Sequence, residues 1–180
     1  MADFVESTHI QGVLTAEHRA FGDERGRFSE VFRREWFPDR SWEAIQLNRS
    51  ESRAGVVRGL HYHLKQIDYW HCLSGQLRIG LHDLRLSSPT RGASQVIDVD
   101  GSCPGGVYIP CGVAHGFLAV TYIVLMYVVD QYYDGADEFG VAWDDPELGL
   151  DWRLDGAAIV SDRDRANPPL AALDSDTLPP

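Results

Sequence analysis

Short apolar stretches alternate with turn residues along most of the chain. Helical periodicity is scarce, whereas the apolar runs are repeatedly interrupted by Gly, Pro, Asp and Asn. This pattern is typical of antiparallel strands in a sandwich or barrel. We therefore predict strands at 12–14, 28–32, 44–49, 56–63, 67–73, 76–83, 94–99, 106–109, 116–120 and 123–129.

Turn signals and chain continuity complete the predicted organisation. Ser74-Gly75-Gln76 predicts a hairpin between two of these strands, and 87–92 predicts a loop. The charged, proline-rich tail from Asp162 onward predicts one short helix near 170–173. No repeat or linker divides the chain, so we expect one domain over 1–180, with its barrel core at about 44–130 and a C-terminal tail at about 155–180.

Composition narrows the classes of function. The length of 180 residues suits one domain, and the net charge of −11 argues against general nucleic-acid binding. No apolar run reaches membrane-spanning length and no secretory signal is visible, so we predict a cytoplasmic protein. The three cysteines lack metal-type spacing, which is consistent with reduced thiols. Lys65 is the only lysine, so nearly all cations are arginines.

Three histidines form the main chemical signal. His61 and His63 alternate on a predicted strand and therefore point to the same face, while His115 follows the turn that begins at Pro110. The spacings from Gly55 to Gly75 and from Pro110 to His115 correspond to two cupin-type elements. We predict an all-β, cupin-type jelly-roll β-barrel with a short helical C-terminal segment. The other four histidines are interpreted as structural.

Several motifs together resemble one enzyme family, that of the dTDP-4-dehydrorhamnose 3,5-epimerases. Gly55-Val-Val-Arg58-Gly-Leu-His61-Tyr is similar to the motif around that family's catalytic histidine. Further similar stretches occur in order along most of the chain, at 23–30, 46–50, 88–90, 109–117, 127, 132–133 and 143–146. The resemblance implies an isomerase of deoxysugar biosynthesis that needs no cofactor and assembles as a homodimer.

The resemblance also implies roles for individual residues. Epimerisation next to a ketone requires a base on one face of the carbon and an acid on the other. The family pattern places the base at His61, held by Asp164, and the acid at Tyr127. Contacts to a dTDP-linked 4-keto sugar, some of them from a neighbouring subunit, fall on Arg25, Phe28, Glu30, Gln46, Asn48, Arg58, His63, His115 and Tyr132.

Two positions depart from the family pattern and leave alternatives open. Asp68 stands where the family has a lysine beside the keto oxygen, and His63 replaces a glutamine. These changes give His61, His63, Asp68 and His115 the spacing of a metal-binding cupin of other activity. A binding protein without catalysis and an epimerase that inverts only C3 or C5 are the remaining alternatives.

Overall fold

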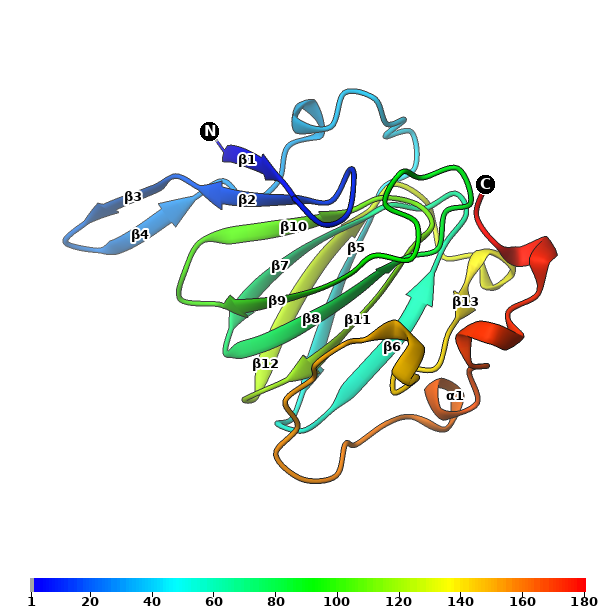
Figure 1. Ribbon diagram of the computed structural model, residues 1–180. Helices are drawn as coiled ribbons and strands as arrows, with labels where there is room; N and C mark the ends of the chain where they lie inside the picture. Colours follow the sequence, from blue (N-terminus) through cyan, green and yellow to red (C-terminus); the bar gives the residue numbers. More distant parts are fainter. Residues whose placement is uncertain (1) are drawn as a thin grey trace.

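Two antiparallel sheets face each other in the computed structural model, which describes residues 2–180 (Figure 1). The larger sheet has six strands in the order β1-β2-β10-β7-β12-β5. Their bounds are Ala2–Glu6 for β1, Leu14–His18 for β2, Gly105–Ile109 for β10, Asp68–Ser74 for β7, Ile123–Val129 for β12 and Gln46–Ser52 for β5.

The facing sheet has five strands in the order β13-β6-β11-β8-β9. Their bounds are Phe139–Gly140 for β13, Val57–Tyr62 for β6, Val113–Ala119 for β11, Gln76–Asp83 for β8 and Ser94–Asp100 for β9. A separate two-stranded hairpin, β3 (Ala20–Asp23) and β4 (Gly26–Ser29), projects away from both sheets (Figure 1).

The helices are short and lie between or after the strands. One α-helix, α1, spans Asp162–Arg165, and 3₁₀ turns occupy Arg34–Trp36, Gly135–Asp137, Pro146–Leu148, Leu170–Ala172 and Ser175–Thr177. Within residues 2–180, no helix combines the length and apolar character needed to cross a membrane.

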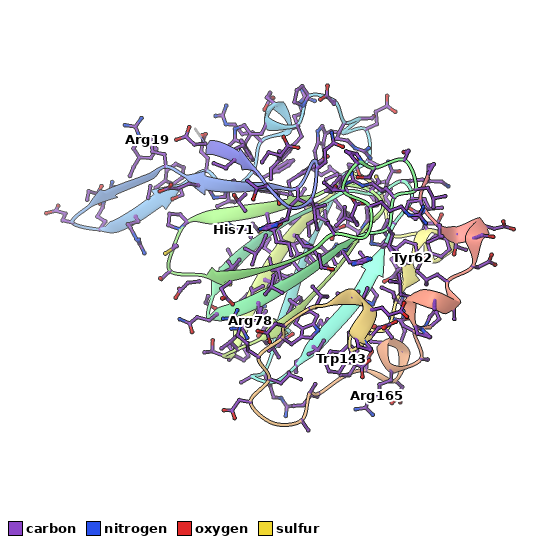
Figure 2. All side chains as sticks on the ribbon, viewed as in Figure 1. Arg19, Tyr62, His71, Arg78, Trp143 and Arg165 are labelled. Carbon is purple, nitrogen blue, oxygen red and sulfur yellow. The ribbon has the colours of Figure 1, made fainter. Side chains whose placement is uncertain are left out.

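The main apolar core is built from side chains of both sheets, on β7, β10 and β12 of the larger one and β8 and β11 of the smaller one. Figure 2 shows all side chains on the ribbon. Leu77, Ile79 and Leu81 of β8 are almost completely buried in this core, because alternate residues of a strand point to one face. The outer face of the same strand is also covered, since Arg78 donates to the backbone oxygen of Trp152 at 2.6 Å. The segment around Trp152 therefore covers part of the outer face of the smaller sheet.

The all-β prediction is confirmed, and two strands have the predicted bounds. These are β8 and β12, whose apolar runs are long and end in clear turn residues. The elements β1, β3, β13 and α1 were not predicted, and β11 begins three residues before its predicted start. The missed elements are short, and most carry charged or small residues, so they have little apolar periodicity. The predicted helix near 170–173 is a single 3₁₀ turn.

The predicted hairpin at Ser74-Gly75-Gln76 is wrong. The turn exists, but β7 and β8 belong to different sheets and do not pair. Gly75 has a φ of +81°, and a Cβ there would lie 2.1 Å from the backbone oxygen of Tyr122. The turn is therefore a tight passage from one sheet to the other, which local residue types cannot distinguish from a hairpin.

Candidate active site

A cavity of about 780 Å³ opens between the two sheets. Strands of both sheets contribute to it, which places residues far apart in the sequence on facing walls. Most of the predicted site residues lie along it: His61, His63, His115, Asp68, Asp164, Tyr127, Gln46, Asn48, Arg58 and Tyr132.

His61 and Asp164 form a direct contact in this cavity. Nε2 of His61 lies 2.7 Å from Oδ1 of Asp164, although 103 positions separate the two residues in the chain. A carboxylate only accepts hydrogen bonds, so in the neutral ring Nε2 carries the proton and Nδ1 has the lone pair. The contact predicted for these two residues is present, and Nδ1 of His61 is the atom able to accept a proton.

Backbone groups hold the Asp164 side chain in place. Its Oδ2 accepts a hydrogen bond from the Gly59 N–H at 3.1 Å, and Ser161 caps α1 by accepting from the Asp164 N–H at 3.1 Å. Burial by itself raises the pKa of the Asp164 carboxyl, but its bonds to His61 and Gly59 outweigh this effect and lower the pKa. The buried carboxylate is therefore ionised beside the imidazole.

Tyr127 reaches the cavity from the opposite sheet. It lies on β12, whereas His61 lies on β6. Burial raises the pKa of the Tyr127 phenol, and the charge of Asp68 adds to this effect, while Arg58 opposes it. The phenol therefore keeps its proton at neutral pH and can act as an acid.

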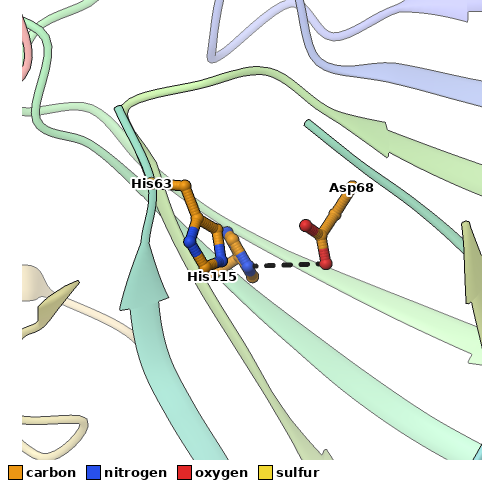
Figure 3. A group of neighbouring side chains, drawn as sticks. All are labelled: His63, Asp68 and His115. Carbon is orange, nitrogen blue, oxygen red and sulfur yellow. Dashed lines mark ion pairs between the residues drawn. The ribbon is translucent and has the colours of Figure 1, made fainter. Parts of the chain in front are cut away.

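His63, Asp68 and His115 form a second group of neighbouring side chains on the cavity wall (Figure 3). The His115 Nε2 is 3.8 Å from an Asp68 oxygen, and burial lowers the pKa of His115 to about 4 against the opposing charge of Asp68. The ring is therefore neutral at neutral pH despite the carboxylate nearby. His61 is not part of this group, in which the ligand-type atoms of His63, Asp68 and His115 lie within 4.8 Å of one another. The predicted four-residue metal set is thus reduced to three residues.

The polar residues predicted for substrate contact divide into two groups. Gln46 and Asn48 are half-buried on β5 and bond to each other at 2.8 Å, while exposed Arg58 lies on the cavity wall. The other group does not line this cavity. Arg25 and Phe28 lie on the β3–β4 hairpin, which projects beyond the sheets (Figure 1), and Glu30 directly follows β4.

Three further cavity residues, Asp137, Glu138 and Arg163, were not predicted from the sequence. Asp137 uses its carboxylate to accept the N–H groups of Leu64 and Lys65, at 2.9 and 3.1 Å. Glu138 forms a 2.9 Å ion pair with Arg163. All three lie in loops or a short helix without a motif, so no local signal marks them. Lys65 is exposed and also borders the cavity.

Comparison with known proteins identifies the family. The sequence profile of the dTDP-4-dehydrorhamnose 3,5-epimerase family matches residues 7–172. The chain belongs to this family. The predicted resemblance is thereby confirmed, and the epimerase interpretation is favoured over the other functions that the sequence left open.

Similar proteins include enzymes that act at two carbons and at one. The dTDP-4-dehydrorhamnose 3,5-epimerase of Sinorhizobium fredii is 34% identical over 94% of this chain and 91% of its own. A Legionella pneumophila 3,5-epimerase in complex with dTDP-4-keto-L-rhamnose has a TM-score of 0.92 at 31% identity, covering 99% and 98% of the two chains. The 3'-monoepimerase ChmJ of Streptomyces bikiniensis, in complex with dTDP-quinovose, has a TM-score of 0.89 at 32% identity, covering 97% and 92%. The cupin-type fold prediction agrees with these structures.

Proposed function

We propose that this protein epimerises a dTDP-linked 4-keto-6-deoxyhexose at C3, C5 or both, in deoxysugar biosynthesis. The observation that carries the proposal is the His61–Asp164 pair on one wall of the cavity with Tyr127 on the facing wall. A base and an acid on opposite walls are what inversion of a carbon centre requires.

The proton transfers follow from the protonation states of these residues. Nδ1 of His61 removes the proton from the carbon next to the ketone, and the electron pair moves onto the C4 oxygen as an enolate. The enolate then collapses while the Tyr127 hydroxyl donates a proton to the opposite face. Solvent takes the proton from His61 and returns one to Tyr127, which restores the enzyme. Asp164 stabilises the imidazolium that forms after the first step.

The remaining cavity residues are assigned to substrate binding. Arg58 is exposed on the cavity wall and offers a planar guanidinium to the diphosphate, with the fork geometry that lysine lacks. Gln46, Asn48, His63 and His115 face the sugar. Tyr132, 66% exposed near the opening, is available to stack on the nucleotide base.

The protruding hairpin supports a homodimer. Phe28 on β4 is 67% exposed and Phe21 on β3 is 49% exposed, so two large apolar side chains face solvent on a strand pair that is hydrogen-bonded into neither sheet. Such exposure favours a protein partner. We assign Arg25, Phe28 and Glu30 to the cavity of the second subunit. Sedimentation should therefore give a dimer of the wild-type chain, and Phe28→Ala should shift it toward monomer.

Organisation and location complete the proposal. We assign 1–180 to one cupin-like domain, for which a single calorimetric unfolding transition is expected. We place the enzyme in the cytoplasm, which agrees with the free thiols of Cys72, Cys103 and Cys111. Cell fractionation tests this location.

Hydrogen exchange tests the reaction. Incubation with dTDP-4-keto-6-deoxyglucose in deuterated water, followed by NMR, should show deuterium entering C3, C5 or both with inversion. Exchange at neither C3 nor C5 would contradict the proposal.

A reaction at one carbon only is the second candidate. Asp68 in place of a lysine puts negative charge near the developing enolate, which changes the stabilisation of the intermediate. Exchange confined to a single carbon identifies this case, and its pattern distinguishes C3 from C5.

A further inference from the structure

His63, Asp68 and His115 converge from three separate parts of the two sheets. Asp68 begins β7, His115 lies within β11, and His63 follows β6 directly. One ligand-type atom from each residue lies within 4.8 Å of the other two (Figure 3). His115 and Asp68 are 5% and 4% exposed, so two members of the group are buried at the cavity wall.

Backbone carbonyls fix the orientation of both imidazoles. Nδ1 of His63 lies 2.7 Å from the Asp137 oxygen, and Nδ1 of His115 lies 2.9 Å from the Val113 oxygen. Because a carbonyl oxygen only accepts, each Nδ1 carries a hydrogen, and in the neutral ring Nε2 is then the nitrogen with the lone pair. Metal-binding histidines are held in this way, with the second ring nitrogen bonded to a backbone carbonyl or carboxylate.

Asp68 is a buried carboxylate whose hydrogen-bond donors are neutral. Its oxygens accept from Gln66 Nε2 and Trp70 Nε1, each at 2.8 Å. Within residues 2–180, the charged or chargeable group closest to an Asp68 oxygen in an ion-pair contact is His115, whose Nε2 lies 3.8 Å away. A buried carboxylate is costly without a positive charge beside it. The group therefore offers two imidazole nitrogens and one buried carboxylate whose hydrogen-bond donors carry no charge.

We infer that His63, Asp68 and His115 bind one divalent transition-metal ion, such as Zn²⁺ or Fe²⁺, with an open coordination position facing the cavity. Two imidazoles and one carboxylate suit these ions. Ligand atoms about 2.1 Å from an ion are roughly 3 to 4 Å apart, so the three side chains must close by about 1 Å on binding.

A metal at this position has a defined use. It would provide positive charge to the enolate oxygen in a cavity whose single lysine, Lys65, is exposed at the rim. This catalytic role rests on the proposed function, whereas metal binding itself does not depend on it.

Metal binding can be measured without any sugar substrate. Untagged protein is purified without chelator for elemental analysis, then stripped, dialysed and titrated with Zn²⁺ or Co²⁺. We expect one ion per chain, with Co²⁺ giving visible absorption bands.

His63→Gln and Asp68→Asn should each weaken binding about 100-fold. His9→Gln, which alters an exposed histidine outside the site, should bind like wild type. Thermal unfolding confirms that each variant is folded.

The outcomes separate this inference from the proposed reaction. Stripped wild type that takes up no ion from equimolar Zn²⁺, or His63→Gln that binds as tightly as wild type, overturns the metal site. Stoichiometric binding lost in His63→Gln supports it even if no tested sugar exchanges protons, in which case only the proposed reaction fails. If Asp68→Asn does not fold, His63→Gln decides, because glutamine keeps a polar side chain of similar length.

Discussion

The hydrogen bond between His61 Nε2 and Asp164 Oδ1 determines which ring nitrogen can take a proton. At 2.7 Å, the carboxylate holds the hydrogen on Nε2, so the lone pair of Nδ1 is the only basic site of the neutral ring. Burial raises the pKa of the Tyr127 phenol, because buried surroundings disfavour the charged phenolate. At the scale of single residues, burial and one hydrogen bond thus assign a base and an acid.

Asp164→Asn tests the role of the carboxylate. The amide can donate to the imidazole and hold the hydrogen on Nδ1, which removes the lone pair that faces the substrate. We expect kcat for proton exchange to fall by about 100-fold or more with little change in fold. Asp162→Asn on the same helix is the control, since Asp162 is fully exposed. Equal rates for Asp164→Asn and wild type would contradict the assignment of Asp164.

Tyr127→Phe separates proton removal from inversion. His61 still removes the proton and can return a deuteron to the same face, but the acid on the opposite face is gone. We therefore expect deuterium exchange without inversion, measured as labelled substrate of unchanged configuration in the NMR spectrum. The matched control is Tyr122→Phe, because Tyr122 is 52% exposed and does not line the cavity. Full inversion by Tyr127→Phe would assign the acid to another group.

At the scale of elements, β6 and β11 approach each other so closely that only glycine fits at their contact. Gly59 has a φ of +102°, and a Cβ there would lie 2.7 Å from the His115 oxygen and 2.9 Å from the Gly116 Cα. The same residue donates its N–H to Asp164. The close approach of two strands therefore also positions the carboxylate that holds the base.

Gly59→Ala is expected to lower both stability and activity. Strain from the positive φ and collision with backbone atoms should together cost about 3 kcal/mol. Gly92→Ala is the control, since Gly92 has a φ of +80° but a Cβ there meets nothing within 4 Å. Its cost should be about 1 kcal/mol. Chemical denaturation measures both values, and equal losses would show that the contact with β11 is unimportant.

At the scale of the whole molecule, the two sheets form the cavity between them and buried polar groups secure the connecting loops. Asp83 at the end of β8 is completely buried and accepts hydrogen bonds from Arg85, Ser88 and Thr90. Burial alone would raise the pKa of this carboxyl, but these bonds lower it to about 2. The loop that follows β8 is thus fixed by one ionised carboxylate.

The lowered pKa of Asp83 predicts how the stability of the protein depends on pH. Its pKa is lower in the folded state than in the unfolded state, so its contribution is present above pH ~4 and is lost as the pH falls toward about 2. Asp83→Asn should therefore reduce the free energy of unfolding by about 2 kcal/mol at pH 7. The difference from wild type should shrink between pH 4 and pH 2. Denaturation at several pH values measures it, and a constant difference would contradict this origin.

The sequence by itself determined the strand character of the chain and the centre of the site. The apolar runs at β8 and β12 have the predicted bounds, and the alternation of His61 and His63 correctly places both on the cavity side. These features depend on residues close together in the chain, because the two-residue period of a strand is a local property.

The tertiary structure decided which partners these residues have. The turn at Gly75 leads into the other sheet, His61 bonds to Asp164 across 103 positions, and His61 is thereby separated from the group formed by His63, Asp68 and His115. Local periodicity gives the direction of each side chain relative to its own strand. It does not give the pairing of strands or the packing of sheets, and these determine which side chains meet.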